Sequence, residues 1–172
     1  MFNINLVTLI LIALLGVENQ KPNFSGNWKP DETKSSTQKR LKTTADAAKA
    51  TAPPPPPSDA RLPSEQIEHN EPVLRIVAIS AKGERLNEVT MRTDGKEHII
   101  KIGAGAMIHR SKSHWEGDTL VTQWHIERDG KIVIEGVDQR SLSEGGKVLT
   151  INRHTEDDKS ESDSVIVYRK QP

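Results

Sequence analysis

A chain of 172 residues has about the length of one domain, so we expect one globular unit with additions at its ends. Lys and Arg together number 24, as do Asp and Glu, and this balance argues against a nucleic-acid partner, because nucleic-acid binders usually carry a basic surplus. The absence of cysteine excludes disulfides, cysteine zinc sites and thiol catalysis, and an aromatic content of 3% leaves a core of Ile, Val and Leu, which favours strands.

The chain begins with an apolar segment. Residues 6–15 read LVTLILIALL, which is the length of a signal-peptide core and is too short to cross a bilayer. No basic residue precedes this run, and Leu14 is large for a position two residues before a cleavage site. A buried strand or helix at the start of the domain is the alternative. We interpret residues 1–20 as a signal peptide or N-terminal anchor, and we expect an exported protein with no membrane span after the leader is removed.

A compact stretch and a low-complexity segment follow the leader. Residues 21–29 contain the sequence Asn-Phe-Ser-Gly-Asn-Trp, and we expect a first strand here. Residues 30–63 are rich in Lys, Thr, Ala, Ser and Pro, with five consecutive prolines at 53–57. Because such a composition buries little apolar surface, we expect a disordered Pro-rich insertion. A ligand for a proline-recognising partner is the alternative.

Residues 64–172 alternate apolar runs of six to ten residues with turn signals, and these runs fit a period of two better than a period of 3.6. In the clearest run, one face of a strand carries Leu120, Thr122, Trp124 and Ile126. Asp-Gly pairs between the runs are typical of tight hairpins, which leave no room for crossover helices. We predict an all-β, antiparallel up-and-down meander of about 8–10 strands, closed into a barrel because closure removes the exposed edges.

The start of the first strand carries a family resemblance. Gly26-Asn27-Trp28 resembles the Gly-x-Trp signature of lipocalins, in which the Trp plugs the closed end of the barrel and an Arg from a late strand packs over it. The resemblance implies a structural plug made of Gly26, Trp28 and Arg169, with Arg153 as a second candidate for the arginine.

Three further segments, 67–72, 115–120 and 141–150, resemble exported bacterial lipocalin-like proteins, calycin-type small β-barrels of unassigned function. The resemblance covers the chain from about residue 23 to its end, apart from the insertion, and it implies a lipocalin-like barrel in a periplasmic or secreted bacterial protein. The Thr-Asp-Tyr type of second lipocalin motif and the usual disulfide are absent.

The six histidines are the first place to look for metal chemistry. No His-x-His pair occurs, and the weak candidates for a transition-metal site are His98, His109 and His125. If the turn at 116–118 sets the register of its hairpin, His109 lies opposite His125. Exposed histidines on the outer wall of a barrel are the simpler interpretation. We therefore expect no metal and no other cofactor.

Catalytic motifs are missing from the sequence. It contains no Gly-x-Ser-x-Gly nucleophile elbow and no phosphate-binding glycine loop, and its paired carboxylates lie in turns where solvation explains them. We expect that the protein is not an enzyme.

The interior of the barrel is the remaining candidate site. Met91, Trp124 and Tyr168 are candidates to line the mouth of an apolar pocket, because rings with polar tips commonly orient ligands in such pockets. Simple core packing is the alternative for each residue. We therefore expect an exported lipocalin-like barrel that binds a small apolar or amphipathic molecule. The alternatives are a solid-core structural protein that engages an envelope partner and, with less support, a metal-dependent enzyme that uses the histidines.

Overall fold

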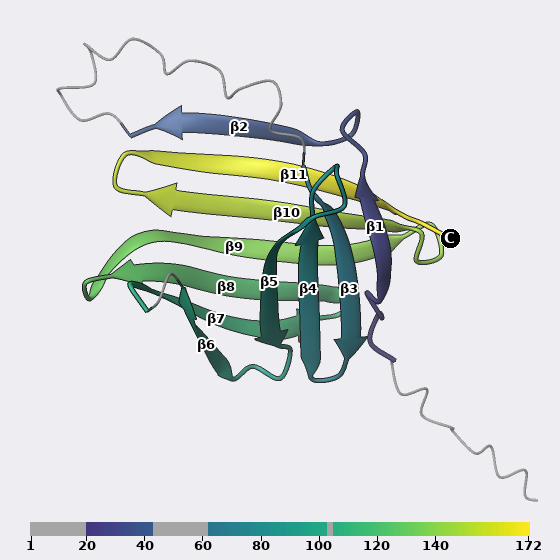
Figure 1. Cartoon of the computed structure of the whole chain (residues 1–172), viewed down its shortest axis with the longest axis horizontal. Coiled ribbons are helices and arrows are strands. Elements are labelled where there is room, and N and C mark those ends of the chain that lie inside the picture. The colour runs from purple at the N-terminus through teal and green to yellow at the C-terminus, as the bar shows by residue number, and fades with distance from the viewer. Residues whose placement is uncertain (1–19, 43–61, 103–104) are drawn as a thin grey trace, which may run out of the picture.

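The computed structural model describes residues 20–42, 62–102 and 105–172, and these ranges form strands and turns without a helix (Figure 1). The apolar run at 6–15 and the five prolines at 53–57 lie outside the described residues. No helix within those three ranges is long and apolar enough to cross a membrane.

Eleven strands make up the described chain. In chain order they are β1 (Gly26–Pro30), β2 (Ser36–Leu41), β3 (Ser64–Asn70), β4 (Val73–Ile79), β5 (Arg85–Arg92), β6 (Glu97–Ile102), β7 (Met107–Glu116), β8 (Thr119–Arg128), β9 (Lys131–Ser143), β10 (Val148–Asp157) and β11 (Ser160–Lys170).

All strands pair antiparallel in one sheet whose order is β5-β4-β3-β1-β11-β10-β9-β8-β7-β6, with β2 paired to β11 beside this path. This confirms the predicted all-β meander. The first strand β1 lies between β3 and the last strand β11, and it thereby links early and late strands in one sheet. The sheet curls until the end of β5 meets β7, where the Gly95 amide donates a 2.8 Å hydrogen bond to the Ser113 carbonyl. The barrel is nearly closed, and its seam lies between β5 and β6.

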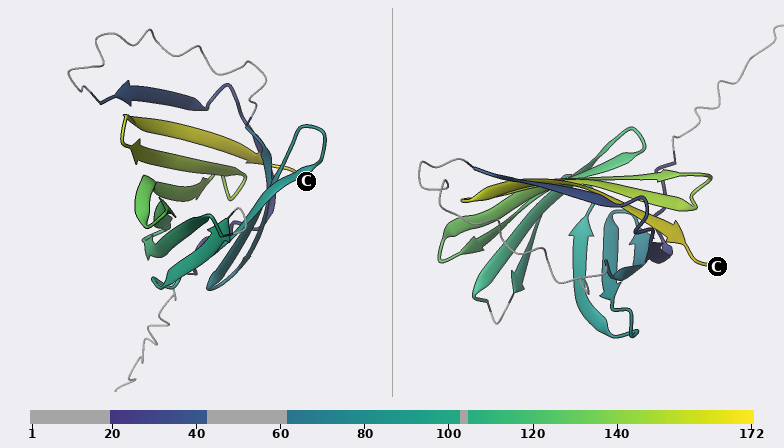
Figure 2. Two further views of the ribbon diagram at one scale, coloured as in Figure 1. Left: turned by 60° about the vertical axis from the view of Figure 1, so that its left-hand side comes forward. Right: turned by 90° about the horizontal axis from the view of Figure 1, so that it is seen from above.

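Strands of different length give the barrel two unlike halves. The short strands β3 to β5 cross in front of one end of β7 to β11, and the long strands continue past them (Figure 1). Seen from above, β3 to β5 form a second layer that covers only this end (Figure 2). These short strands therefore cover one end of the inner face, which we call the covered end. They leave the other end, which we call the open end, uncovered.

The covered end holds the hydrophobic core. Its buried side chains come from the short and the long strands together and are Phe24, Trp28, Ile67, Leu74, Ile76, Met91, Leu120, Leu149, Ile151, Ile166 and Tyr168. Alternation along each strand directs these residues inward, as the period of two predicted. The Trp28 side chain is only 1% exposed, and its indole N–H donates to the Phe24 carbonyl at 2.9 Å.

The strand β2 differs from the prediction. Residues 30–63 were expected to be disordered, yet Ser36–Leu41 pairs with the N-terminal half of β11, residues 160–165. β1 covers only one part of β11, so the remaining N–H and C=O groups of that strand need other partners. The guanidinium of Arg40 adds ion pairs to Glu161 and Asp163 at 2.7 and 2.6 Å.

Candidate functional site

Register partners divide the inner face into rows that run across the strands. Beyond the core lies a row that we call the polar row, made of Ser113, Thr122, Asp138, Arg153 and Ser164. The next row toward the open end contains Ser111, Trp124 and Gly136. The following row, which we call the mouth row, is made of Ile100, His109, Ile126 and Ile134. The inner face thus changes from apolar to charged and back to apolar.

Asp138 is the centre of the polar row. It is 2% exposed and accepts hydrogen bonds from Arg153 at 2.7 and 2.6 Å, from Arg140 at 2.9 Å and from the Trp124 indole at 3.2 Å. Desolvation alone would raise the pKa of Asp138, but the Arg140 charge and the Arg153 hydrogen bonds outweigh it and lower the pKa to about 2. Asp138 is therefore ionised at neutral pH and holds two guanidinium groups inside the barrel.

Trp124 forms a wall between the polar row and the open end. It is half-buried, and its indole packs on the backbone of Gly136, its register partner on β9. A Cβ atom on Gly136 would lie 2.7 Å from the Trp124 ring and 2.5 Å from the His154 carbonyl oxygen, so only glycine fits here. The His109 ring lies beside the indole, with 6.0 Å between the ring centroids. The Trp124 ring therefore lies between Asp138 and His109 of the mouth row.

Glu65 reaches the charged cluster from β3, on the opposite wall. Its Oε1 accepts a 3.2 Å hydrogen bond from the Tyr168 hydroxyl. Desolvation raises the pKa of Glu65, and the nearby charges of Arg140 and Arg153 oppose this shift only in part. The same burial, together with Glu65, raises the pKa of Tyr168. The fold therefore favours the neutral form of both groups.

Several buried polar atoms of this region have no hydrogen-bond partner among the described residues. They are Nε and Nη1 of Arg140, Oε2 of Glu65, Oγ of Ser111 and Nδ1 of His109. A buried donor or acceptor without a partner costs about 1–3 kcal/mol, and more when the group is charged. The accumulation of such atoms on one inner face marks it as a place where a bound molecule would complete the hydrogen bonding.

The structure places the three predicted pocket residues at different depths. Met91 is 5% exposed and lies in the core, where its sulfur faces the hydroxyl groups of Ser113 and Thr122 at 3.9 Å. Tyr168 is 2% exposed and lies between the core and Glu65. Trp124 alone of the three is partly exposed.

Gly26 and Trp28 lie at the covered end, and the cation beside Trp28 is a lysine and not the expected arginine. Trp28 pairs with Lys170, whose ammonium group lies 5.4 Å from the centre of the indole ring. Arg169 points to the opposite face and binds Asp31 at 3.1 Å. Gly26 has a φ of 145° and lies against the Lys170 side chain, where a Cβ would come within 2.5 Å. Arg153, the second candidate for this role, binds Asp138 instead.

The predicted register of the β7–β8 hairpin is wrong by one residue. Glu116 pairs with Thr119, so His109 lies opposite Ile126, and His125 lies opposite Arg110. Because a one-residue shift moves a side chain to the other face, His109 points inward and His125 outward. His98 also lies on the inner face, as the register partner of Ser111. In the described part of the chain, no group of three His, Asp or Glu side chains could hold a metal ion.

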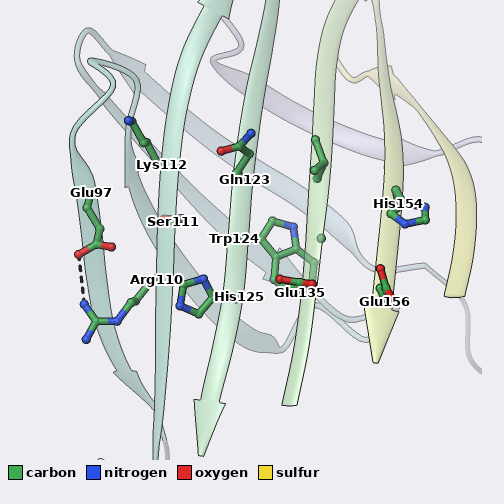
Figure 3. Close-up of a pocket in the computed structure, with 12 residues that line it drawn as sticks. Glu97, Arg110, Ser111, Lys112, Gln123, Trp124, His125, Glu135, His154 and Glu156 are labelled. Carbon is green, nitrogen blue, oxygen red and sulfur yellow. Dashed lines mark hydrogen bonds and ion pairs between the residues drawn. The ribbon is translucent and has the colours of Figure 1, made fainter. Parts of the chain in front are cut away.

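A groove of about 450 Å³ lies on the outer face of β7 to β10 (Figure 3). Its charged side chains largely neutralise one another. Arg110 binds Glu97 and Glu127, and the His125 ring also contacts Glu127 at 3.0 Å. The His154 ring contacts Asp163 at 2.8 Å. Of the unpartnered buried side-chain atoms in the described residues, only Oγ of Ser111 belongs to a residue that lines this groove, so we place the candidate site on the inner face.

The sequence pattern alone did not identify the charged residues of the inner face as candidates. Asp138 and Arg140 alternate with Gln139, and they share a face with Ile134 and Leu142. This shared face was the available signal, since charged residues at positions that otherwise point inward need partners. Arg153 was considered only for the plug.

Comparison of the sequence with models of protein families found no match, and comparison with curated proteins found none either. The likeness to lipocalins therefore rests on architecture. The nearly closed, antiparallel all-β barrel is consistent with a lipocalin-like fold.

Proposed function

We propose that the protein binds one small amphipathic molecule on the inner face of its barrel. The observation that carries this proposal is the sequence of rows, because charged groups lie deep and apolar groups lie at the open end. A ligand with a polar head and an apolar tail matches that order when its head enters first. Barrels of this size commonly hold one small ligand.

The apolar part of the site is the mouth row. Ile100, Ile126 and Ile134 are each partly exposed, although neighbouring strands surround them on the same face. Together with the Trp124 ring they offer an apolar surface that a ligand tail would cover. Covering such surface contributes about 25 cal/mol per Å² removed from water. The packed core at the covered end leaves the mouth row available to a ligand tail, since the polar row separates the two regions.

Export to the periplasm or to the outside of a bacterial cell is part of the proposal. The apolar run at 6–15, the absence of cysteine and the resemblance to exported lipocalin-like proteins support it. In that setting the protein would carry or retain a sparingly soluble molecule and would perform no catalysis. Nothing in the proposal requires a metal.

The test is calorimetric titration of the full chain with dodecanol and dodecanoate as monomeric probes. Saturable binding of at least one of them is expected. Ile126→Asp places a carboxylate in the mouth row and should weaken that binding by roughly tenfold or more, because a charge opposes burial by the tail. Ile99→Asp, on the outer face of the adjoining hairpin, is the matched control and should bind normally. Equal binding by both variants would exclude the mouth row as the site.

A further inference from the structure

Arg140 is a buried cation with donors to spare. Its side chain is 5% exposed, and one nitrogen, Nη2, donates to Asp138 at 2.9 Å. Its Nε and Nη1 have no partner within the ranges that the structure describes. Leu120 and Ile151 are its register partners on either side, so these neighbouring positions offer no acceptor side chain. An acceptor for Arg140 must therefore come from elsewhere.

Glu65 is one candidate, because the Arg140 charge acts on it, yet no hydrogen bond joins the two groups in the described part of the chain. Its Oε1 accepts from Tyr168, and its Oε2 is also left without a partner. Burial favours the neutral form of this carboxyl group, because it raises the pKa of Glu65. A neutral acid adds no negative charge to balance Arg140. When Glu65 is neutral, the cluster contains two guanidinium groups and one carboxylate, Asp138, and it has one positive charge in excess.

Arg153 is the more exposed of the two arginines and lies one row closer to the open end than Arg140. It uses Nε and Nη2 to bind Asp138, and its side chain remains 36% exposed. The Trp124 indole, which donates to Asp138, lies between this place and His109 of the mouth row. An anionic group that enters from the open end thus meets Arg153 first and the free donors of Arg140 beyond it.

We propose that Arg140, together with Arg153, binds the carboxylate of an alkyl carboxylic acid whose chain lies along the mouth row. This inference rests on the proposed function and names the chemical class of its ligand. A single negative charge balances the one excess positive charge. A phosphate monoester, which carries about −1.5 to −2 at neutral pH, would exceed it. The carboxylate oxygens also accept hydrogen bonds only, and guanidinium nitrogens only donate them.

The test compares dodecanoate, dodecanol and dodecyl phosphate at neutral pH by calorimetric titration of the full chain, each below its micelle concentration. Dodecanoate should bind roughly tenfold or more tightly than dodecanol, as expected for hydrogen bonds to a charged group. Arg140→Lys keeps the charge and a donor for Asp138 but removes Nε and Nη1, so it should weaken this preference. Arg75→Lys, on the outer face of β4, is the control and should keep the preference.

Each other outcome overturns a defined part of the account. Equal affinity of the wild-type protein for dodecanoate and dodecanol would refute the carboxylate site and leave the binding of amphipathic molecules in place. Tighter binding of dodecyl phosphate than of dodecanoate would show that the site prefers a phosphate and would refute the carboxylate as the head group. Binding of none of the three would refute the proposed function itself. The comparison of probes uses wild-type protein, so it remains decisive if Arg140→Lys does not fold, which near-ultraviolet circular dichroism reports.

Discussion

Glu65 and Asp138 both lie on the inner face, yet their surroundings move their pKa values in opposite directions. Desolvation acts on both groups, but two arginines bind Asp138 directly and lower its pKa to about 2. Among the described residues, Glu65 has only the Tyr168 hydroxyl as a hydrogen-bond donor, and its pKa is raised. Direct ion pairing, more than burial itself, therefore decides which carboxyl group is charged inside the barrel.

The raised pKa of Glu65 predicts how stability depends on pH. The neutral form is favoured by folding, so its contribution is fully present below the unfolded value of 4.5 and is lost as pH rises through the raised pKa. Glu65→Gln cannot ionise and should gain stability over wild type toward pH 9, by about 1.4 kcal/mol for each unit that the pKa is raised. Thermal unfolding from pH 5 to 9 measures this. Glu68→Gln, exposed on the outer face of β3, should show no such gain, and parallel curves for wild type and Glu65→Gln would contradict the account.

At the scale of strands, the sequence pattern predicted most elements and failed at two places for physical reasons. Alternation predicted the face of Trp124 and the meander, because one buried face imposes a period of two. β2 could not be predicted, since its polar sequence pairs through the backbone and through charges supplied by β11. The β7–β8 register depends on whether the turn has two or three residues. The buried charges of Asp138 and Arg140 were missed because their partners come from other strands.

The place of β2 predicts a gradient of amide protection. β10 has hydrogen-bonded neighbours on both sides, whereas β2 pairs with β11 alone among the strands that the structure describes. Edge strands open more easily, so the β2 amides bonded to β11 should exchange faster than those of β10 and slower than unstructured chain. Hydrogen exchange followed by mass spectrometry compares the exchange rate of the β2 amides with the rates of β10 and of unstructured chain. Exchange of β2 at the rate of an unfolded peptide would show that Ser36–Leu41 is not paired, and exchange as slow as in β10 would contradict its edge position.

At the scale of the whole molecule, the unequal strand lengths separate the buried core from the proposed binding site. The short strands cover one end of the long strands and bury the core there, including Trp28 and Leu149 (Figure 2). The other end keeps its inner face accessible, and the polar row lies at the boundary. A molecule bound at the open end can therefore enter without any loss of core packing. The two halves should respond differently to a ligand.

Nuclear magnetic resonance of the indole N–H groups tests this central claim most directly, because the tryptophans sample both halves. The Trp124 N–H donates to Asp138 beside the proposed site, and the Trp28 N–H donates to Phe24 in the buried core. On titration with dodecanoate, we expect the Trp124 indole signal to shift with saturation while the Trp28 signal stays in place. Trp124 also lines the outer groove, so a saturable shift that extends to groove residues such as Val137 and His154 and spares Ile126 and Ile134 would contradict binding on the inner face, as would the absence of any shift.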